Sequence, residues 1–168
     1  SHLRKGQALA VDGQVLGLAA AKQLRENTDR AGIRLVTQVD LLEGAWAERP
    51  GLPAAAVYDH VPPQAPIGRP AKLALLRDAM ARHGATHHFV STVDDIAWIT
   101  NLRGADVDYN PVFLAHLMIS HHAATLFVGS GKVNAALEAA LAADGIVLAD
   151  YAGAAPALAA LGGGTRLL

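Results

Sequence analysis

Two adjacent carboxylates, Asp94 and Asp95, could serve acid/base or metal chemistry. They fall in the first turn of a short helix predicted over residues 94–100, and Ser91 and Thr92 precede it as N-cap candidates. Acidic side chains in a first turn interact favourably with the helix dipole. Because no histidine or further acid adjoins the pair, we prefer this structural interpretation to a metal site.

A polar loop at residues 101–106, with the sequence N-L-R-G-A-D, follows that helix. An arginine guanidinium presents a planar fork of N–H donors that matches a carboxylate, and loops often carry binding residues. We therefore select Asn101, Arg103, Gly104 and Asp106 as candidates to face a peptide or a carboxylate. The alternative is that Arg103 and Asp106 fix the loop to their own domain.

The stretch at residues 129–132, G-S-G-K, resembles half of a phosphate-binding loop. The full pattern is G-x-x-x-x-G-K-[ST]. Here the first glycine is missing, and Val133 stands where a hydroxyl would be required. A strand-to-helix turn explains the stretch at least as well, so a nucleotide-binding domain is the weaker hypothesis.

The eight histidines do not form a metal-binding pattern. Adjacent pairs occur at residues 87–88 and 121–122, but neighbours in a strand point to opposite faces and do not readily chelate one ion. No His-x-x-x-His stretch contains a helper glutamate. We therefore expect surface or packing histidines and no metal site.

In the N-terminal part, hydrophobic spacing predicts a strand at residues 8–11, a helix at 15–31 and a second strand at 33–36. Such a βαβ unit favours parallel pairing of its strands. Asp40 is then predicted to cap a short helix that extends to Trp46.

Prolines concentrate at residues 49–53 and 62–70. Proline lacks a backbone N–H and disrupts helix interiors, so this region is predicted to be a linker or a long surface loop. We place a domain boundary near Pro50, between residues 1–50 and residues 51–168.

The second part alternates helices and strands around one antiparallel hairpin. This pattern predicts an α/β domain with a mixed β-sheet flanked by helices. The chain stops inside the last predicted strand, which suggests a truncated domain. The predicted helices are 72–83, 94–100, 133–143 and 154–161, and the predicted strands are 88–91, 112–119, 125–128, 146–149 and one that begins at 166.

The composition is that of a globular protein, with 52% hydrophobic and 17% charged residues. The formal net charge is -1 and no basic stripe is present, which argues against a nucleic-acid partner. No apolar run approaches the roughly 18 residues that would suggest a membrane span, so no membrane partner is expected. Cysteine is absent, and a cytoplasmic location is the expectation.

Residues 94–106 resemble the segment D-[DE]-I-A-W-L-x-N-[LI]-R-G-x-D of the three-domain aminopeptidase P enzymes. These are Xaa-Pro aminopeptidases of the creatinase/prolidase superfamily of pita-bread metallopeptidases. Residues 40–50 resemble the family's N-L-V-D-x-I-W-x-x-R-P stretch, and residues 72–80 resemble its K-x-x-x-[LI]-R-x-x-M helix. The resemblance covers most of the chain in order.

This resemblance implies a ribonuclease-H-like fold, with a mixed sheet and flanking helices. In the family, two similar N-terminal domains precede a catalytic domain. Residues 1–50 would then be the end of the first N-terminal domain and residues 51–168 most of the second, with the catalytic domain absent.

The family's chemistry is hydrolysis of the bond between an N-terminal residue and a following proline. It uses two divalent metal ions, usually manganese, that activate a bridging hydroxide. All five metal ligands belong to the catalytic domain. The resemblance therefore assigns no catalytic residue, metal ligand or cofactor to this chain.

By resemblance, the chain is a non-catalytic portion that shapes the substrate cleft and supports assembly. The implied partners are its own C-terminal catalytic domain and a peptide with proline at the second position, and a homodimer is left open. Residues 101–106 would belong to the cleft wall, with Arg103 as the charged contact. The alternative is a free-standing ribonuclease-H-like interaction module without a peptidase role.

Overall fold

The structure, a computed structural model, describes residues 2–42, 44–46 and 48–168. The chain divides into two compact units, Ser1–Gly51 and Leu52–Leu168. The assignment of the first unit to the end of another domain stays a prediction.

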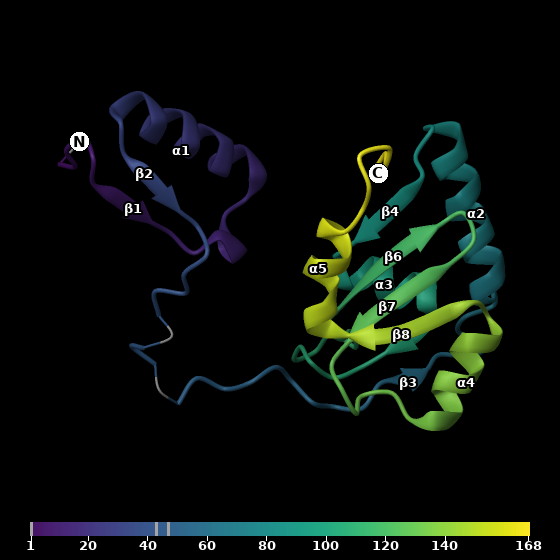
Figure 1. Ribbon diagram of the computed structural model, residues 1–168. Helices are drawn as coiled ribbons and strands as arrows, with labels where there is room; N and C mark the ends of the chain where they lie inside the picture. Colours follow the sequence, from purple (N-terminus) through teal and green to yellow (C-terminus); the bar gives the residue numbers. More distant parts are fainter. Residues whose placement is uncertain (1, 43, 47) are drawn as a thin grey trace. The chain divides into compact units, whose positions relative to one another are not determined.

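The first unit is a βαβ unit with parallel strands (Figure 1). β1 (Ala8–Ala10) pairs with β2 (Arg34–Val36), and the connection contains the 3₁₀ helix η1 (Gly13–Val15) and the helix α1 (Leu18–Ala31). The parallel pairing agrees with the prediction. α1 begins later than predicted, because Gly17 has an extended backbone and forms its N-cap.

Turns replace the short helix predicted after Asp40, among the residues described there. The Asp40 carboxylate accepts a hydrogen bond from the Leu42 N–H at 2.9 Å. The N–H groups of Ala45 and Trp46 both donate to the Leu42 carbonyl. The prediction also falls on residues 43 and 47, which lie outside the described residues.

The second unit contains a four-stranded sheet in the order β4-β6-β7-β8 (Figure 1). Its strands are β4 (His87–Val90), β6 (Ala115–Ser120), β7 (Ala124–Val128) and β8 (Ile146–Asp150). β6 runs antiparallel to β4 and β7, whereas β8 is parallel to β7. The mixed α/β architecture predicted from the sequence is confirmed.

Two shorter pairings also occur in the second unit. β3 (Tyr58–Asp59) pairs antiparallel with β5 (Leu102–Arg103). The C-terminal residues run along β4, where the Leu168 N–H donates to the His87 carbonyl at 2.9 Å. The strand predicted from residue 166 is thus reduced to one parallel bridge, between His87 and Leu167.

Helices lie on both faces of the four-stranded sheet. In Figure 1, α3 (Val93–Thr100) lies behind the sheet and α5 (Ala154–Ala159) lies in front of it. Tyr151, just before α5, packs on His116 of β6 with 4.9 Å between the ring centroids. The remaining helices of this unit are α2 (Arg69–Arg82), α4 (Ala135–Ala143) and the 3₁₀ helix η2 (Tyr151–Gly153).

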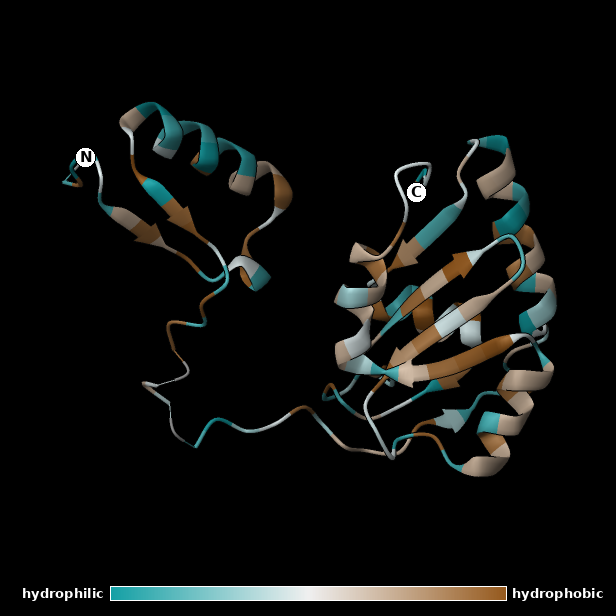
Figure 2. Ribbon diagram, viewed as in Figure 1, coloured by the Kyte–Doolittle hydropathy of each residue, from teal (hydrophilic) through white to brown (hydrophobic). Residues whose placement is uncertain are grey.

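The core of the second unit lies on one face of the sheet. Along β6, Ala115, Leu117 and Ile119 are buried, and the side chains between them are half-buried. The strands of this sheet are largely brown in Figure 2, whereas α1 of the first unit is largely teal. Leu102 and Phe113 are also fully buried. Because Leu102 directly precedes Arg103 and Phe113 packs against Gly104, the core anchors the loop that carries the candidate residues.

Candidate functional site

Asn101 ends α3 and turns the chain into β5 with a left-handed backbone, φ 51°. Asparagine is one of the few residues that adopt this conformation routinely. Its buried side chain donates from Nδ2 to the Ile67 carbonyl at 2.9 Å, and its Oδ1 accepts a hydrogen bond from the Lys72 ammonium. Asn101 therefore joins the end of α3 to the beginning of α2.

Arg103 lies half-buried against the end of α3. Its Nη1 donates to the carbonyls of Ala97 and Leu102, both at 2.8 Å. A cation at the C-terminus of a helix interacts favourably with the helix dipole. The Nε and Nη2 groups make no hydrogen bond to any residue that the structure describes, so part of the guanidinium remains available.

Lys72, in α2, is only 4% exposed. Its Nζ donates to the Trp98 carbonyl at 2.6 Å and lies 4.3 Å from the centroid of the Trp98 ring. Burial lowers the pKa of Lys72 below its ordinary value, and the positive charges of Arg103 and Arg69 lower this pKa further. Lys72 and Arg103 thus form a cationic centre.

The cationic centre opens onto a pocket of about 180 Å³. No aspartate or glutamate is among its lining residues. Lysine, arginine and an aromatic ring around one cavity can bind an anion that carries an apolar group. The polar and aromatic lining residues are His60, Gln64, Lys72, Trp98, Asn101 and Arg103.

Gly104 and Asp106 lie in the domain interior instead. A Cβ atom on Gly104 would lie 2.7 Å from the Phe113 Cβ, so only glycine fits there. The Asp106 side chain is 0% exposed and pairs with Lys132, which is 2% exposed. Asp106 Oδ2 also accepts the Leu114 N–H at 2.7 Å. The structure therefore brings Asn101 and Arg103 together at the pocket and separates them from Gly104 and Asp106.

The sequence-based selection omitted Lys72, Trp98 and His60. One signal for Lys72 was present in the sequence, because Lys72, Leu76 and Met80 follow a spacing of four and lie on one face of α2. A lysine on the apolar face of a helix is rarely buried without a specific partner. His60 gave no comparable signal, since only the pairing of β3 with β5 brings it to the pocket.

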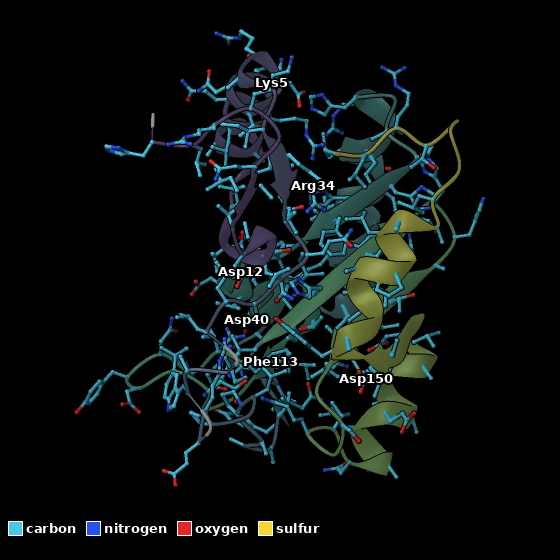
Figure 3. The ribbon with its side chains drawn as sticks, turned by 60° about the vertical axis from the view of Figure 1, so that its left-hand side comes forward. Lys5, Asp12, Arg34, Asp40, Phe113 and Asp150 are labelled. Atoms are coloured by element: carbon cyan, nitrogen blue, oxygen red, sulfur yellow. The ribbon has the colours of Figure 1, made fainter. Side chains whose placement is uncertain are left out.

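The G-S-G-K stretch does not present its lysine to a ligand. Lys132 Nζ donates to Asp106 and to the Pro53 carbonyl, the latter at 3.2 Å. The adjacent pocket of about 270 Å³ is lined by two acids, Glu138 and Asp150. Asp150 lies at the end of β8, where the chain enters η2 just before α5 (Figure 3). Carboxylates beside the loop repel a phosphate, which weakens the nucleotide-binding hypothesis.

Asp94 and Asp95 occupy the first turn of α3 and are exposed. His88 Nδ1 donates a hydrogen bond to the Leu168 carbonyl oxygen at 2.8 Å, so this histidine ties β4 to the C-terminal residues. No group of three or more histidine and acidic side chains is placed to hold a metal ion within the described ranges.

Across the described residues, no helix combines the length and apolar character that a membrane crossing requires.

Comparison with known proteins identifies the second unit. The family model of the creatinase/prolidase N-terminal domain matches residues 48–168. "Probable Xaa-Pro aminopeptidase P" of Metarhizium acridum is 33% identical over 154 residues, and its counterpart in Colletotrichum graminicola is 34% identical over 151 residues. Each match covers 87% of this chain and 24% of the relative, so the chain spans about a quarter of their length.

A solved structure shares the fold. The X-prolyl aminopeptidase from Caenorhabditis elegans, described as a cytosolic enzyme with a di-nuclear active site, matches with a TM-score of 0.81. The match has 20% sequence identity and covers 90% of this chain and 25% of the nematode chain. With the family match over most of its length and this agreement in fold, the chain belongs to the creatinase/prolidase N-terminal domain family.

Proposed function

We propose that this chain is the non-catalytic N-terminal portion of an Xaa-Pro aminopeptidase. The strongest support is the similarity, across 87% of the chain, to fungal proteins named for this activity. The substrate is then a peptide with proline at its second position. Catalysis is then carried out by a C-terminal catalytic domain of the same protein, which is the partner of this chain.

The metal centre of this proposal also belongs to the catalytic domain. The nematode relative is described as having a di-nuclear active site. Within its described part, this chain offers no side-chain cluster that fits two divalent metal ions. Manganese is the metal we propose for the catalytic domain, and the cytosol, the stated location of the nematode enzyme, is the location we propose for this protein.

In this proposal the surface around Arg103 forms part of the substrate-cleft wall and supports assembly, including a homodimer. Two observations favour Arg103 for the contact with substrate: its guanidinium retains unused donors, and it borders a pocket without acids. Asn101, Gly104 and Asp106 then hold the loop in place, because all three are tied into their own domain.

The catalytic assignment is tested with the isolated chain and a Xaa-Pro peptide. We expect no release of the N-terminal residue, with or without added manganese, measured by chromatography of the products. Peptidase activity that co-elutes with the purified chain in size-exclusion chromatography would contradict the non-catalytic assignment.

The cleft role is tested in the full-length enzyme with Arg103→Ala. We expect kcat/KM to fall at least about tenfold, because a hydrogen bond to a charged group contributes about 1.5–3 kcal/mol, while the bound metal content stays unchanged. Arg82→Ala, at an exposed position near the end of α2, is the control. An unchanged kcat/KM in the Arg103→Ala enzyme would show that Arg103 does not contact substrate in the cleft.

A further inference from the structure

Of the three cations near the end of α3, Arg69 has carboxylate partners, whereas Lys72 and Arg103 have none among the described residues. Arg69 pairs with both Asp59 and Asp144, the latter at 2.8 Å. Lys72 is 4% exposed, and a buried charge without a counter-ion is strongly unfavourable. The protein therefore holds a nearly buried positive charge that an anion would stabilise.

The two cations that line the pocket keep unused hydrogen-bond donors. The Lys72 ammonium has three N–H donors, and it uses two, on the Trp98 carbonyl and Asn101 Oδ1. Arg103 uses only Nη1, on two carbonyls at the end of α3. The pocket of about 180 Å³ that both residues line contains no acid. The Lys72 ammonium and the Arg103 guanidinium thus line the same cavity, and each has N–H donors that are not used within the protein.

The other walls define the kind of anion that fits. The Trp98 side chain is large and half-exposed, with 47% of the residue accessible. Apolar Ala65, Pro66 and Ile67 also line the pocket, and the remaining lining residues besides the two cations are His60, Gln64 and Asn101. A guanidinium matches the planar carboxylate with two parallel hydrogen bonds. The small volume and the apolar walls favour a carboxylate attached to an apolar group over a nucleotide or a larger polyanion.

We propose that the pocket formed by Lys72, Trp98 and Arg103 is a binding site for a carboxylate, with the apolar part of the ligand on the Trp98 ring. The carboxylate comes either from the free C-terminus of a short peptide or from an acidic side chain. The lowered pKa of Lys72 agrees with this site, because its causes are burial first and then the positive charges of Arg103 and Arg69, and a bound carboxylate would counter both. The site does not rest on peptidase activity.

Fluorescence of Trp98 provides the test. The chain has two tryptophans, so Trp46→Phe leaves Trp98 as the single reporter. This variant is titrated at constant ionic strength with N-acetylleucine, with N-acetylleucine amide, with N-acetylglutamic acid α-amide and with inorganic phosphate. We expect a saturable change with one or both carboxylates and none with N-acetylleucine amide. Tighter binding of N-acetylleucine indicates a peptide C-terminus, and tighter binding of the glutamic acid derivative indicates an acidic side chain.

Variants connect the signal to the two cations. Arg103→Met and Lys72→Met are each expected to weaken carboxylate binding at least about tenfold, whereas Arg82→Met leaves it unchanged. Far-ultraviolet circular dichroism verifies that each variant is folded. If Lys72→Met does not fold, nuclear magnetic resonance of the Lys72 ε-methylene in the wild-type chain replaces it, and saturating N-acetylleucine is expected to raise the pKa of Lys72.

Three results would overturn the site: no saturable change with either carboxylate, an equal change with the amide or with phosphate, or full binding by Arg103→Met. These results are separate from the proposed function. Suppose that the chain binds the carboxylate and that Arg103→Ala has the wild-type kcat/KM. Arg103 would then have no role in the substrate cleft, and the carboxylate site would still be supported.

Discussion

The ion pair between Asp106 and Lys132 is enclosed on all sides, with side-chain exposures of 0% and 2%. We expect Asp106→Asn to lower the free energy of unfolding by about 3–5 kcal/mol, because it leaves the buried ammonium of Lys132 without a counter-charge. Urea denaturation monitored by circular dichroism measures this change. Asp108→Asn, at an exposed position in the same loop, is the matched control.

A double variant tests the cause of that loss. If the uncompensated charge is responsible, adding Lys132→Met to Asp106→Asn restores part of the lost stability. A double variant that is less stable than both single variants would show instead that the residues contribute independently.

We expect His116 to make the stability of the second unit depend on pH. It stacks between Phe89, at 5.5 Å, and Tyr151, at 4.9 Å between ring centroids, and burial lowers the pKa of His116. The unfolded chain then binds a proton more readily than the folded chain. This contribution to stability is retained above a pH of about 6.5, the pKa of a free histidine, and is lost as the pH falls from there through the lower folded pKa.

Replacement of His116 checks this sign. We expect His116→Gln to reduce the decrease in the thermal midpoint between about pH 7 and pH 5, a range that spans the free histidine pKa. His122→Gln, in the exposed turn after β6, serves as the control. A His116→Gln profile that runs parallel to the wild-type profile would exclude His116 as the source.

At the level of elements, Gly104 fixes how closely the loop after β5 approaches the segment before β6. We expect Gly104→Ala to reduce the free energy of unfolding by about 1–3 kcal/mol, since its Cβ would lie 2.7 Å from the Phe113 Cβ and the core must shift. Gly162→Ala, which meets no atom within 4 Å, is expected to be close to neutral. Thermal denaturation compares the two, and equal midpoints would contradict this packing argument.

The elements with a strong local pattern were predicted closely. β7 and β8 differ from their predicted ranges by one residue at one end, because continuous apolar runs between turns define strands. Residues 112–114, predicted as part of a strand, are not in β6. Val112 and Phe113 pack under the loop, and the Leu114 N–H bonds to Asp106 instead of a neighbouring strand.

The candidate site was predictable only in part. The loop stood out in the sequence because its polar residues are contiguous. The pocket did not, since it depends on contacts between segments that are far apart along the chain: Lys72 with Asn101, and β3 with β5. The pairing of Asp106 with Lys132, which separates Asp106 from the pocket, joins two charged residues that gave no sign in the sequence of being buried together.

At the scale of the whole molecule, the two units differ in how much they bury. The hydrophobic core cluster lies within residues 57–146 of the second unit. Among the described residues of the first unit, only Thr28 and Ile33 are buried. Stability within a protein follows the local density of buried apolar contacts. The parallel pair of β1 and β2 is therefore held mainly by its backbone hydrogen bonds.

Hydrogen exchange of the complete chain tests this difference. We expect the hydrogen-bonded amides of β1 and β2 to exchange at least roughly a hundredfold faster than those of β6 and β7, because local opening of a poorly packed unit requires little free energy. Mass spectrometry of peptic fragments resolves the two groups. Equal protection of the two groups of amides would contradict the argument from burial. It would mean that contacts other than those within the first unit also stabilise β1 and β2.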